Sequence, residues 1–324
     1  MQYFKLPAGV RDVLPDECER FDAAERVLRE RFRGAGFLPV RPAGLEYYDT
    51  YADAGVEEAQ MFKMCDRDGR LIVLRPDMTL ACARIAATKL HGEGARLCYF
   101  SAVYDFTASG NCDREVPQAG VEVFGEQGAR SDAEIIAFAV GCLRALGLRD
   151  FIVDIGHVGF YKGLLEGSGL SVEGAEEVRA RINAKDAVGC ELALRRHGAG
   201  ERAQAAILAL PSLFGGAEVL GRAKTLTDNP RALASLAHLE EVYAHLCDLG
   251  VGGHVSFDLG TVKSLAYYTG IVFTGLADGV GAPVLSGGRY DGLCARFGRD
   301  LAAVGFAVGM DRALSAARAK EGTC

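Results

Sequence analysis

Hydrophobic spacing in the first 150 residues predicts an early helix followed by short strands alternating with helices. Apolar residues recur at three- and four-residue steps over about 16–33, and a pair of glycines follows, as is typical of a helix end. Segments rich in β-branched or aromatic residues, bounded by Gly, Pro or Asp, predict strands. These strands cover about 70–74, 97–103, 120–124 and 151–155, with helical composition at 78–90 and 131–146.

The pattern changes in the second half of the chain. From about 160 to 250 it is helical throughout, and one amphipathic stripe is typical of a core-facing helix. That stripe consists of Leu233, Leu236, Leu239, Tyr243 and Leu246. Strand-like segments return at 254–259, 265–273 and 282–285, and a strand-to-helix junction is predicted at 305–314. Strands on both sides of a helical block favour one α+β domain over 1–324, with a helical insertion at about 160–250, rather than a doubly wound fold.

Composition narrows the class of protein. With 324 residues, 49% of them hydrophobic, the chain is long and apolar enough to bury a large core. A net charge of −7 argues against unspecific attraction to nucleic acid. No apolar run approaches the ~20 residues that span a bilayer, so we expect a cytoplasmic protein without membrane contact. The ten cysteines form no CxxC pair, which predicts reduced thiols and no metal site, and no cofactor is expected.

The segment LRPDMT places Asp77 and Thr79 between a predicted strand and a predicted helix. Both residue types are favoured at helix N-termini, where they accept backbone hydrogen bonds. The functional interpretation is capture of a ligand ammonium by Asp77, supported by Thr79. Taken alone, the segment favours capping.

The segment QAGVEVFG places Gln118 and Glu122 on one face of a strand, because side chains two or four residues apart share a face. Gly120 lies between them, and we expect its missing side chain to leave room for a ligand. A buried Glu122 without a partner would be costly. A ligand with N–H donors, such as an imidazole, would satisfy it.

A third group lies in VKSLAYYTGIVF and LSGGRYDGL. It comprises Lys263, Tyr267, Tyr268, Arg289, Tyr290 and Asp291. The structural alternative is ordinary strand composition followed by a glycine-rich turn. Two tyrosines beside a lysine provide aromatic walls, hydroxyl partners and a counter-charge for a carboxylate, which suits a zwitterionic ligand.

These motifs, in this order, resemble the catalytic fold of class II aminoacyl-tRNA synthetases, and specifically the histidyl-tRNA synthetase lineage. The resemblance runs from LPAGVRDVLP to GFAVGMDR and implies an antiparallel sheet flanked by helices. It assigns histidine amine binding to Asp77, Thr79 and Gln118. It assigns imidazole recognition to Glu122 and Tyr268, with Tyr267 and Tyr290 lining the pocket.

Departures from the synthetase pattern argue against catalysis. By this resemblance, Tyr104 stands where the synthetase has an arginine on the ATP α-phosphate. Lys263 replaces a second arginine, and Ala266 replaces a nearby acidic residue. Losing one charge-assisted contact costs ~1.5–3 kcal/mol, so two such losses predict that adenylation is inefficient. The chain ends shortly after the last motif, and we therefore expect no anticodon-binding domain and no tRNA partner.

The segments DIGHVGF and LALPSLFGGAEVL are similar to the regulatory subunits of ATP phosphoribosyltransferase. That resemblance implies a non-catalytic chain required by a short catalytic subunit in the first step of histidine biosynthesis, with histidine as feedback effector. It also implies self-dimerisation within a hetero-oligomer, and a Lys263 that contacts the histidine carboxylate. The alternatives are a truncated synthetase-like enzyme that adenylates or transfers an amino acid, and a scaffold with a vestigial pocket.

Overall fold

A computed structural model of the chain describes residues 5–107, 114–260 and 267–318. Within these ranges, nine strands form one large sheet in the order β1-β5-β6-β12-β11-β10-β7-β9-β8. Pairing is antiparallel except for β1 with β5 and β7 with β9. The strands are β1 (Leu38–Pro39), β5 (Ala95–Tyr104), β6 (Glu115–Phe124), β7 (Phe151–His157), β8 (Phe214–Gly215), β9 (Val255–Asp258), β10 (Ile271–Ala277), β11 (Leu285–Arg289) and β12 (Ala303–Gly309). The predicted α+β class is confirmed.

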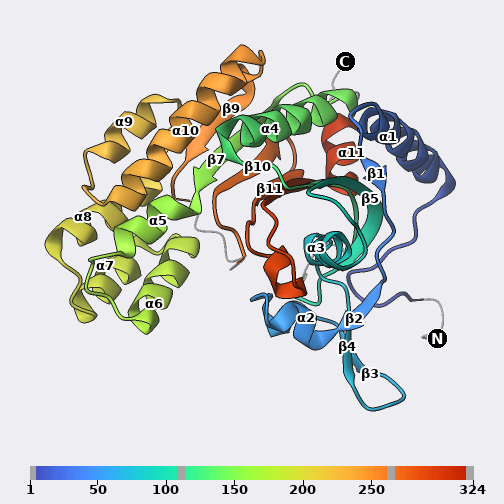
Figure 1. The fold of residues 1–324 in the computed structure, drawn as a ribbon, viewed down its shortest axis with the longest axis horizontal. Coiled ribbons are helices and arrows are strands. Elements are labelled where there is room, and N and C mark those ends of the chain that lie inside the picture. Colours follow the sequence, from blue (N-terminus) through green and yellow to red (C-terminus); the bar gives the residue numbers. More distant parts are fainter. Residues whose placement is uncertain (1–4, 108–113, 261–266, 319–324) are drawn as a thin grey trace.

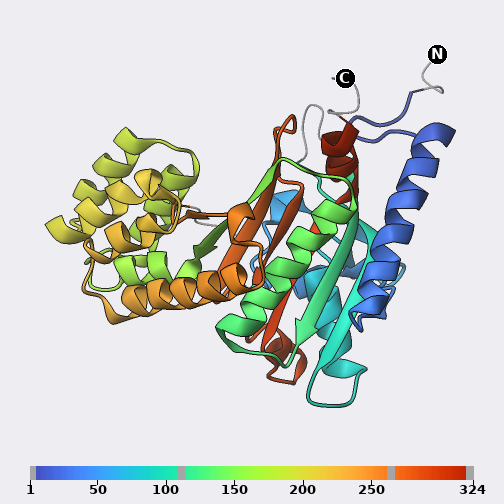
Figure 2. The same cartoon turned by 90° about the horizontal axis from the view of Figure 1, so that it is seen from above.

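One face of this sheet is covered by helices α1 (Pro15–Gly34), α4 (Gly128–Ala145) and α11 (Met310–Arg318) (Figures 1 and 2). The alternation of side chains along β6 explains why helices cover this face. Ala119, Val121 and Val123 face the hydrophobic core beneath these helices. The intervening residues, including Glu122, point to the opposite face, which carries the candidate site.

The opposite face is covered by α3 (Thr79–Thr88) and a second, smaller sheet. In the described part of the chain this sheet has the order β2-β4-β3, all antiparallel. Its strands are β2 (Leu45–Tyr47), β3 (Lys63–Cys65) and β4 (Leu71–Leu74), and α2 (Tyr48–Ala52) follows β2 directly. A separate core cluster forms here, so the large sheet is sandwiched between two apolar layers.

Beyond β7 the chain leaves the sheet, forms a run of helices and returns as β9 beside β7. The helices are α5 (Val158–Leu165), α6 (Val172–Asn183), α7 (Ala187–Arg196), α8 (Glu201–Ala209), α9 (Glu218–Lys224) and α10 (Pro230–Asp248). Pro230 begins α10, and the Asn229 side chain accepts hydrogen bonds from two of its first backbone N–H groups. Leu236, Leu239 and Leu246 of the predicted stripe are fully buried, as expected of a core-facing helix.

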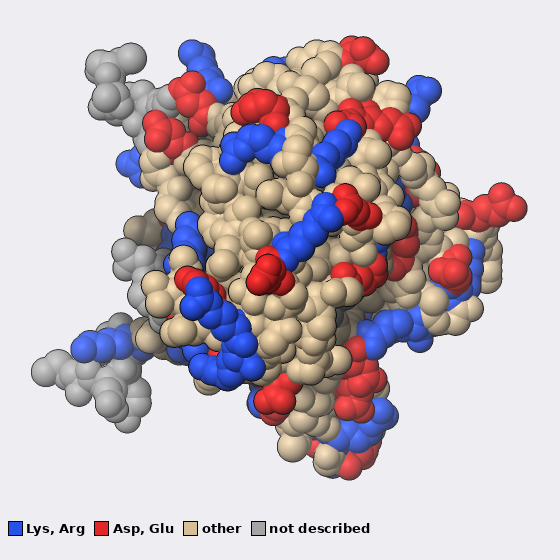
Figure 3. All heavy atoms as spheres, turned by 90° about the vertical axis from the view of Figure 1, so that its left-hand side faces the viewer, with Lys and Arg blue, Asp and Glu red and all other residues tan. Residues whose placement is uncertain are grey.

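The side of the molecule formed by this helical part carries acidic and basic side chains interspersed over an otherwise uncharged surface (Figure 3). Pairs such as Arg195 with Glu191 on α7 account for part of that mixture. Among the residues described, no helix is both long and apolar enough to cross a bilayer.

Two predicted strands near the C-terminus were misplaced. Residues 265 and 266 of the strand expected at 265–273 lie outside the described residues, and its described part begins at Ile271. The strand expected at 282–285 begins at Leu285 and continues through Gly287 and Gly288, for which a turn was the alternative. The second strand extends further than expected because of the surroundings of Gly287 and Gly288. A Cβ on Gly287 would lie 2.4 Å from the Phe273 ring, and one on Gly288 would lie 2.6 Å from the Tyr268 ring. These glycines are strand residues whose surfaces aromatic rings cover, rather than turn residues.

Candidate functional site

Asp77 precedes α3, and its two carboxylate oxygens have different partners. Oδ1 accepts a hydrogen bond from the backbone N–H of Leu80 at 2.9 Å, which caps the helix. Oδ2 accepts one from the Tyr267 hydroxyl at 3.2 Å, which turns that oxygen toward the large sheet. The capping interpretation is therefore right for Oδ1, whereas Oδ2 faces the Tyr267 hydroxyl.

Glu122 is the most deeply buried acid of the predicted set, with 1% of its surface exposed. The Thr79 hydroxyl donates to its Oε1 at 2.9 Å, and the Tyr290 hydroxyl donates to its Oε2. Gly305 on the neighbouring strand makes the position possible, because a Cβ there would lie 1.8 Å from Oε2. The partner that a buried Glu122 requires is thus provided within the protein by two hydroxyls, which the sequence did not indicate.

The electrostatics of this site are unusual for two carboxyl groups. Burial raises the pKa of Glu122 from 4.5 to about 8, although hydrogen bonds from Tyr290 and Thr79 oppose the shift and the charge of Asp77 adds to it. Burial also raises the pKa of Asp77, against the lowering effects of its bonds from Leu80 and Tyr267. A ligand bearing N–H donors or a positive charge would lower both values.

Three tyrosines form the wall of the site. Tyr267, Tyr268 and Tyr290 are all buried, and their ring centroids lie 5.0 Å (Tyr267 to Tyr268) and 6.1 Å (Tyr267 to Tyr290) apart. Burial raises the pKa of each hydroxyl, so all three stay neutral and act as hydrogen-bond donors near pH 7. The structure thus brings five of the predicted residues into one hydrogen-bonded cluster: Asp77, Thr79, Glu122, Tyr267 and Tyr290. Tyr268 completes the aromatic wall of this cluster.

Gln118 lies on the same face of β6 as Glu122, two rows nearer the start of the strand, and is partly exposed. The room expected above Gly120 is filled by Tyr99. A Cβ at Gly120 would lie 2.3 Å from that ring, so the missing side chain accommodates a tyrosine instead of a ligand. Tyr99 is a site residue that sequence reasoning missed, because only the pairing of β5 with β6 places it opposite Gly120.

Arg289 and Asp291 lie outside the cluster. Arg289 forms a buried ion pair with Asp132 on α4 (Nη2 to Oδ1, 2.7 Å), and His238 on α10 contacts the other Asp132 oxygen at 2.7 Å. Asp291 pairs with Arg289 at 3.0 Å. This network joins the large sheet to α4 and α10, so both residues are structural.

The positions that distinguish the chain from a synthetase are only partly visible. Lys263 and Ala266 lie outside the described residues. Tyr104 ends β5, and its hydroxyl donates to Glu115 across the strand pair at 3.2 Å. Within the residues described, no group of three His, Cys, Asp or Glu side chains is arranged to hold a metal ion.

Comparison with known proteins gives consistent matches over nearly the whole chain. Residues 9–313 match the family model of histidyl-tRNA synthetase. A protein of Acetivibrio thermocellus named ATP phosphoribosyltransferase regulatory subunit is 39% identical over 315 residues, covering 96% of this chain and 75% of the relative. One of the same name from Syntrophotalea carbinolica is 40% identical, covering 96% and 76%.

Comparison with solved structures gives matches to the same two kinds of protein. The crystal structure of an ATP phosphoribosyltransferase regulatory subunit/histidyl-tRNA synthetase from Bacillus halodurans superposes with a TM-score of 0.89 at 34% identity, covering 97% of this chain and 83% of that one. A histidine–tRNA ligase subunit from Alicyclobacillus acidocaldarius gives 0.80 at 29% identity, covering 98% of each chain.

Proposed function

Because this chain belongs to the histidyl-tRNA synthetase-like family of ATP phosphoribosyltransferase regulatory subunits, we propose that its Glu122 site binds histidine and thereby controls a catalytic partner. The chain is a non-catalytic regulatory subunit, and phosphoribosyl transfer to ATP belongs to a separate catalytic subunit. We further infer a cytoplasmic hetero-oligomer in which this chain dimerises and does not read tRNA.

The observation that carries the proposal is a pair of carboxyl groups, the buried Glu122 and the half-buried Asp77, bonded to hydroxyls and a backbone N–H. Glu122 and Asp77 both have raised pKa values because burial disfavours their charge. An imidazole N–H donated to Glu122 and an α-ammonium near Asp77 Oδ2 would each favour the ionised carboxylate. Histidine carries both groups, and the buried tyrosines provide the flat apolar walls that an imidazole ring requires.

The remaining predicted contacts complete the proposed pocket. Thr79 donates a hydrogen bond to Glu122 through its hydroxyl, and Gln118 lies on the same strand face, where we propose that it contacts the amine end of the ligand. Lys263 is proposed to contact the carboxylate. As a point charge without a bidentate fork, it would hold that carboxylate less rigidly than an arginine.

Binding alone does not make histidine an inhibitor. Histidine shifts the equilibrium between active and inactive assemblies only if its affinity for the two differs. A coupling free energy of ~1–3 kcal/mol is typical of allosteric proteins and would suffice.

Calorimetric titration of histidine into the whole chain tests the site. Glu122→Ala should abolish binding, because it removes the acceptor for the imidazole. Glu115→Ala is the matched control, since it lies on the same strand but on the opposite face and bonds only with Tyr104 among the contacts described. Undiminished histidine binding by Glu122→Ala would exclude this pocket. Histidine-dependent pyrophosphate exchange by the isolated chain would instead favour the synthetase-like enzyme.

A further inference from the structure

The sheet face that carries Glu122 continues toward β9 and opens into a second site. Strand register aligns Glu122 with Gly305, Gly288, Val272 and Gly156 in one row across the sheet. The Tyr268 ring lies on Gly288 and divides that row. Beyond Tyr268 the same face carries a second group of polar side chains, on β7, β9 and β11.

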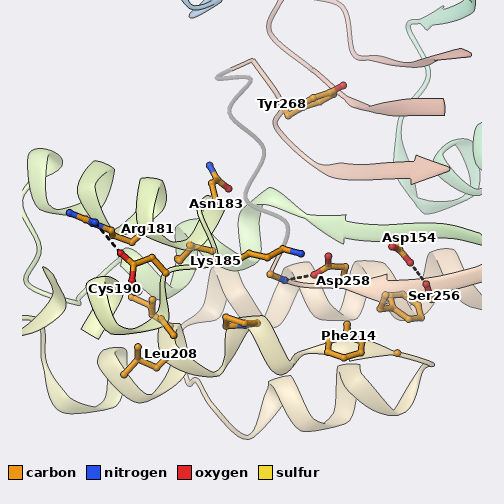
Figure 4. Close-up of a pocket in the computed structure, with 18 of the residues that line it drawn as sticks. Asp154, Arg181, Asn183, Lys185, Cys190, Leu208, Phe214, Ser256, Asp258 and Tyr268 are labelled. Carbon is orange, nitrogen blue, oxygen red and sulfur yellow. Dashed lines mark hydrogen bonds and ion pairs between the residues drawn. The ribbon is translucent and has the colours of Figure 1, made fainter. Parts of the chain in front are cut away.

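Those polar side chains form the floor of a large cavity between the sheet and the helical part (Figure 4). Its volume is about 1100 Å³, slightly above the usual range for small-molecule sites. Asp154 on β7 pairs with Ser256 on β9, and Asp258 follows on β9. Ser286 on β11 lies in the same row, separated from Asp154 by Thr274 of β10. Tyr268 lines the cavity from the histidine-site side.

The floor is a set of oxygen atoms suited to sugar hydroxyls. The Ser256 hydroxyl donates to Asp154 Oδ1, which fixes both side chains. Asp258 is held by a hydrogen bond from the backbone N–H of Gly260 to Oδ1 at 2.9 Å. Carboxylates fixed in this way are the groups that proteins use to accept hydrogen bonds from ribose hydroxyls. Ser286 adds an exposed hydroxyl to the same floor.

The opposite wall carries a cation, Lys185, that forms no ion pair with any other residue that the structure describes. Lys185, in the turn between α6 and α7, is the one non-glycine residue of the described chain with positive φ, at 54°. Figure 4 shows its side chain extending across the cavity toward Asp258. Within the described residues Lys185 makes no ion pair, whereas neighbouring Arg181 is neutralised by Asp186 at 3.0 Å. A left-handed lysine costs free energy, and its amine is left available to a ligand.

The third side of the cavity is apolar. It is formed by Phe214, Leu208 and Pro211, and Phe214 is 65% exposed although aromatic. A flat heterocycle placed there would cover this ring.

We propose that this cavity binds a nucleoside phosphate. The ribose hydroxyls would bond to Asp154 and Ser286, the base would pack on the apolar side, and the phosphate would meet Lys185, whose compact charge suits phosphate. The site is distinct from the Glu122 cluster and does not require histidine to bind there. Tyr268 borders both, so occupancy of one site should change the affinity of the other.

The test is calorimetric titration of adenosine 5′-monophosphate, and separately of adenosine, into the whole chain. Lys185→Asn removes the amine while asparagine tolerates positive φ. We expect it to weaken AMP binding about tenfold or more and to change adenosine binding less than twofold, because only AMP carries the phosphate. Asp154→Asn should weaken both ligands, since both carry the ribose. Lys89→Asn, at an exposed lysine that does not line the cavity, is the matched control.

Absence of saturable AMP binding at millimolar concentration would overturn the proposal, as would equal AMP affinities of the Lys185→Asn and Lys89→Asn variants. Thermal unfolding of each variant confirms that its fold is intact. Histidine titration of the same samples keeps the two sites distinguishable, because failure of the nucleotide site leaves histidine binding unchanged.

Discussion

Replacing Glu122 by glutamine should make the ligand-free protein more stable, increasingly so as pH rises. The native pKa of Glu122 is raised to about 8 by burial, whereas the unfolded value is close to 4.5. A group whose folded pKa is raised contributes stability fully below its unfolded pKa and loses it as pH rises toward the folded pKa. Glutamine keeps the shape and carries no proton to lose.

The size of the stability change follows from the difference between the folded and unfolded pKa values of Glu122. Between the two pKa values the folded protein holds one proton that the unfolded chain does not, so stability falls by roughly 1.4 kcal/mol for each pH unit. From pH 5 to pH 7 the wild type should lose about 3 kcal/mol relative to Glu122→Gln. For a chain of 324 residues that corresponds to a relative change of about 4 °C in the unfolding midpoint.

The assay is thermal unfolding of both proteins in a pH series at constant ionic strength, without histidine. The other titrating groups are common to both proteins, so their contributions cancel in the difference, apart from that of Asp77, whose charge acts on the Glu122 carboxylate but not on glutamine. The difference in midpoint should widen steadily from pH 5 to pH 7 and level off near pH 8. Midpoints that stay a constant distance apart would refute the reasoning, because they would mean that Glu122 titrates equally in the folded and unfolded states.

Three further predictions concern the same face of the sheet. Histidine binding near pH 7 should release about one proton, because Glu122 ionises when the ligand binds. The calorimetric binding enthalpies in phosphate and in Tris should therefore differ by the difference between the ionisation enthalpies of the two buffers. Equal binding enthalpies would contradict this prediction. Gly305→Ala should destabilise the chain by roughly 1–3 kcal/mol and abolish histidine binding, because the new Cβ would meet Glu122 and the Val121 carbonyl; unchanged denaturant unfolding and binding would argue against the described packing. Arg289→Met should cost about 3–5 kcal/mol in the same unfolding assay, since it leaves Asp132 buried without its cation, and a loss below 1 kcal/mol would show that His238 alone satisfies Asp132.

Much of the architecture follows from local patterns in the sequence. The apolar spacing of α1 and α10 locates both helices to within a few residues, because amphipathic periodicity depends only on neighbours along the chain. The pairing of Gln118 with Glu122 on one face follows from strand alternation in the same way. The resemblance to synthetases indicates which segments of the sequence meet at Glu122.

What local patterns could not predict depends on contacts between distant residues. The partner of Glu122, Tyr290, lies 168 positions away, and Arg289 reaches Asp132 across 157. A glycine-rich turn stayed an open alternative for Gly287 and Gly288 of β11, because nothing nearby in the sequence indicates that Phe273 and Tyr268 cover them. The same holds for Tyr99 above Gly120, and for the cavity beyond Tyr268, whose walls come from both the sheet and the helical part.

The most direct test of the central claim is a histidine titration of phosphoribosyl transfer by a short catalytic subunit activated with this chain. With the wild-type chain, the account predicts activity that falls as histidine saturates the Glu122 site. With Glu122→Gln, the complex should remain active and insensitive to histidine at the same concentrations. Inhibition at an unchanged histidine midpoint in the Glu122→Gln complex would contradict the account, because histidine would then act elsewhere.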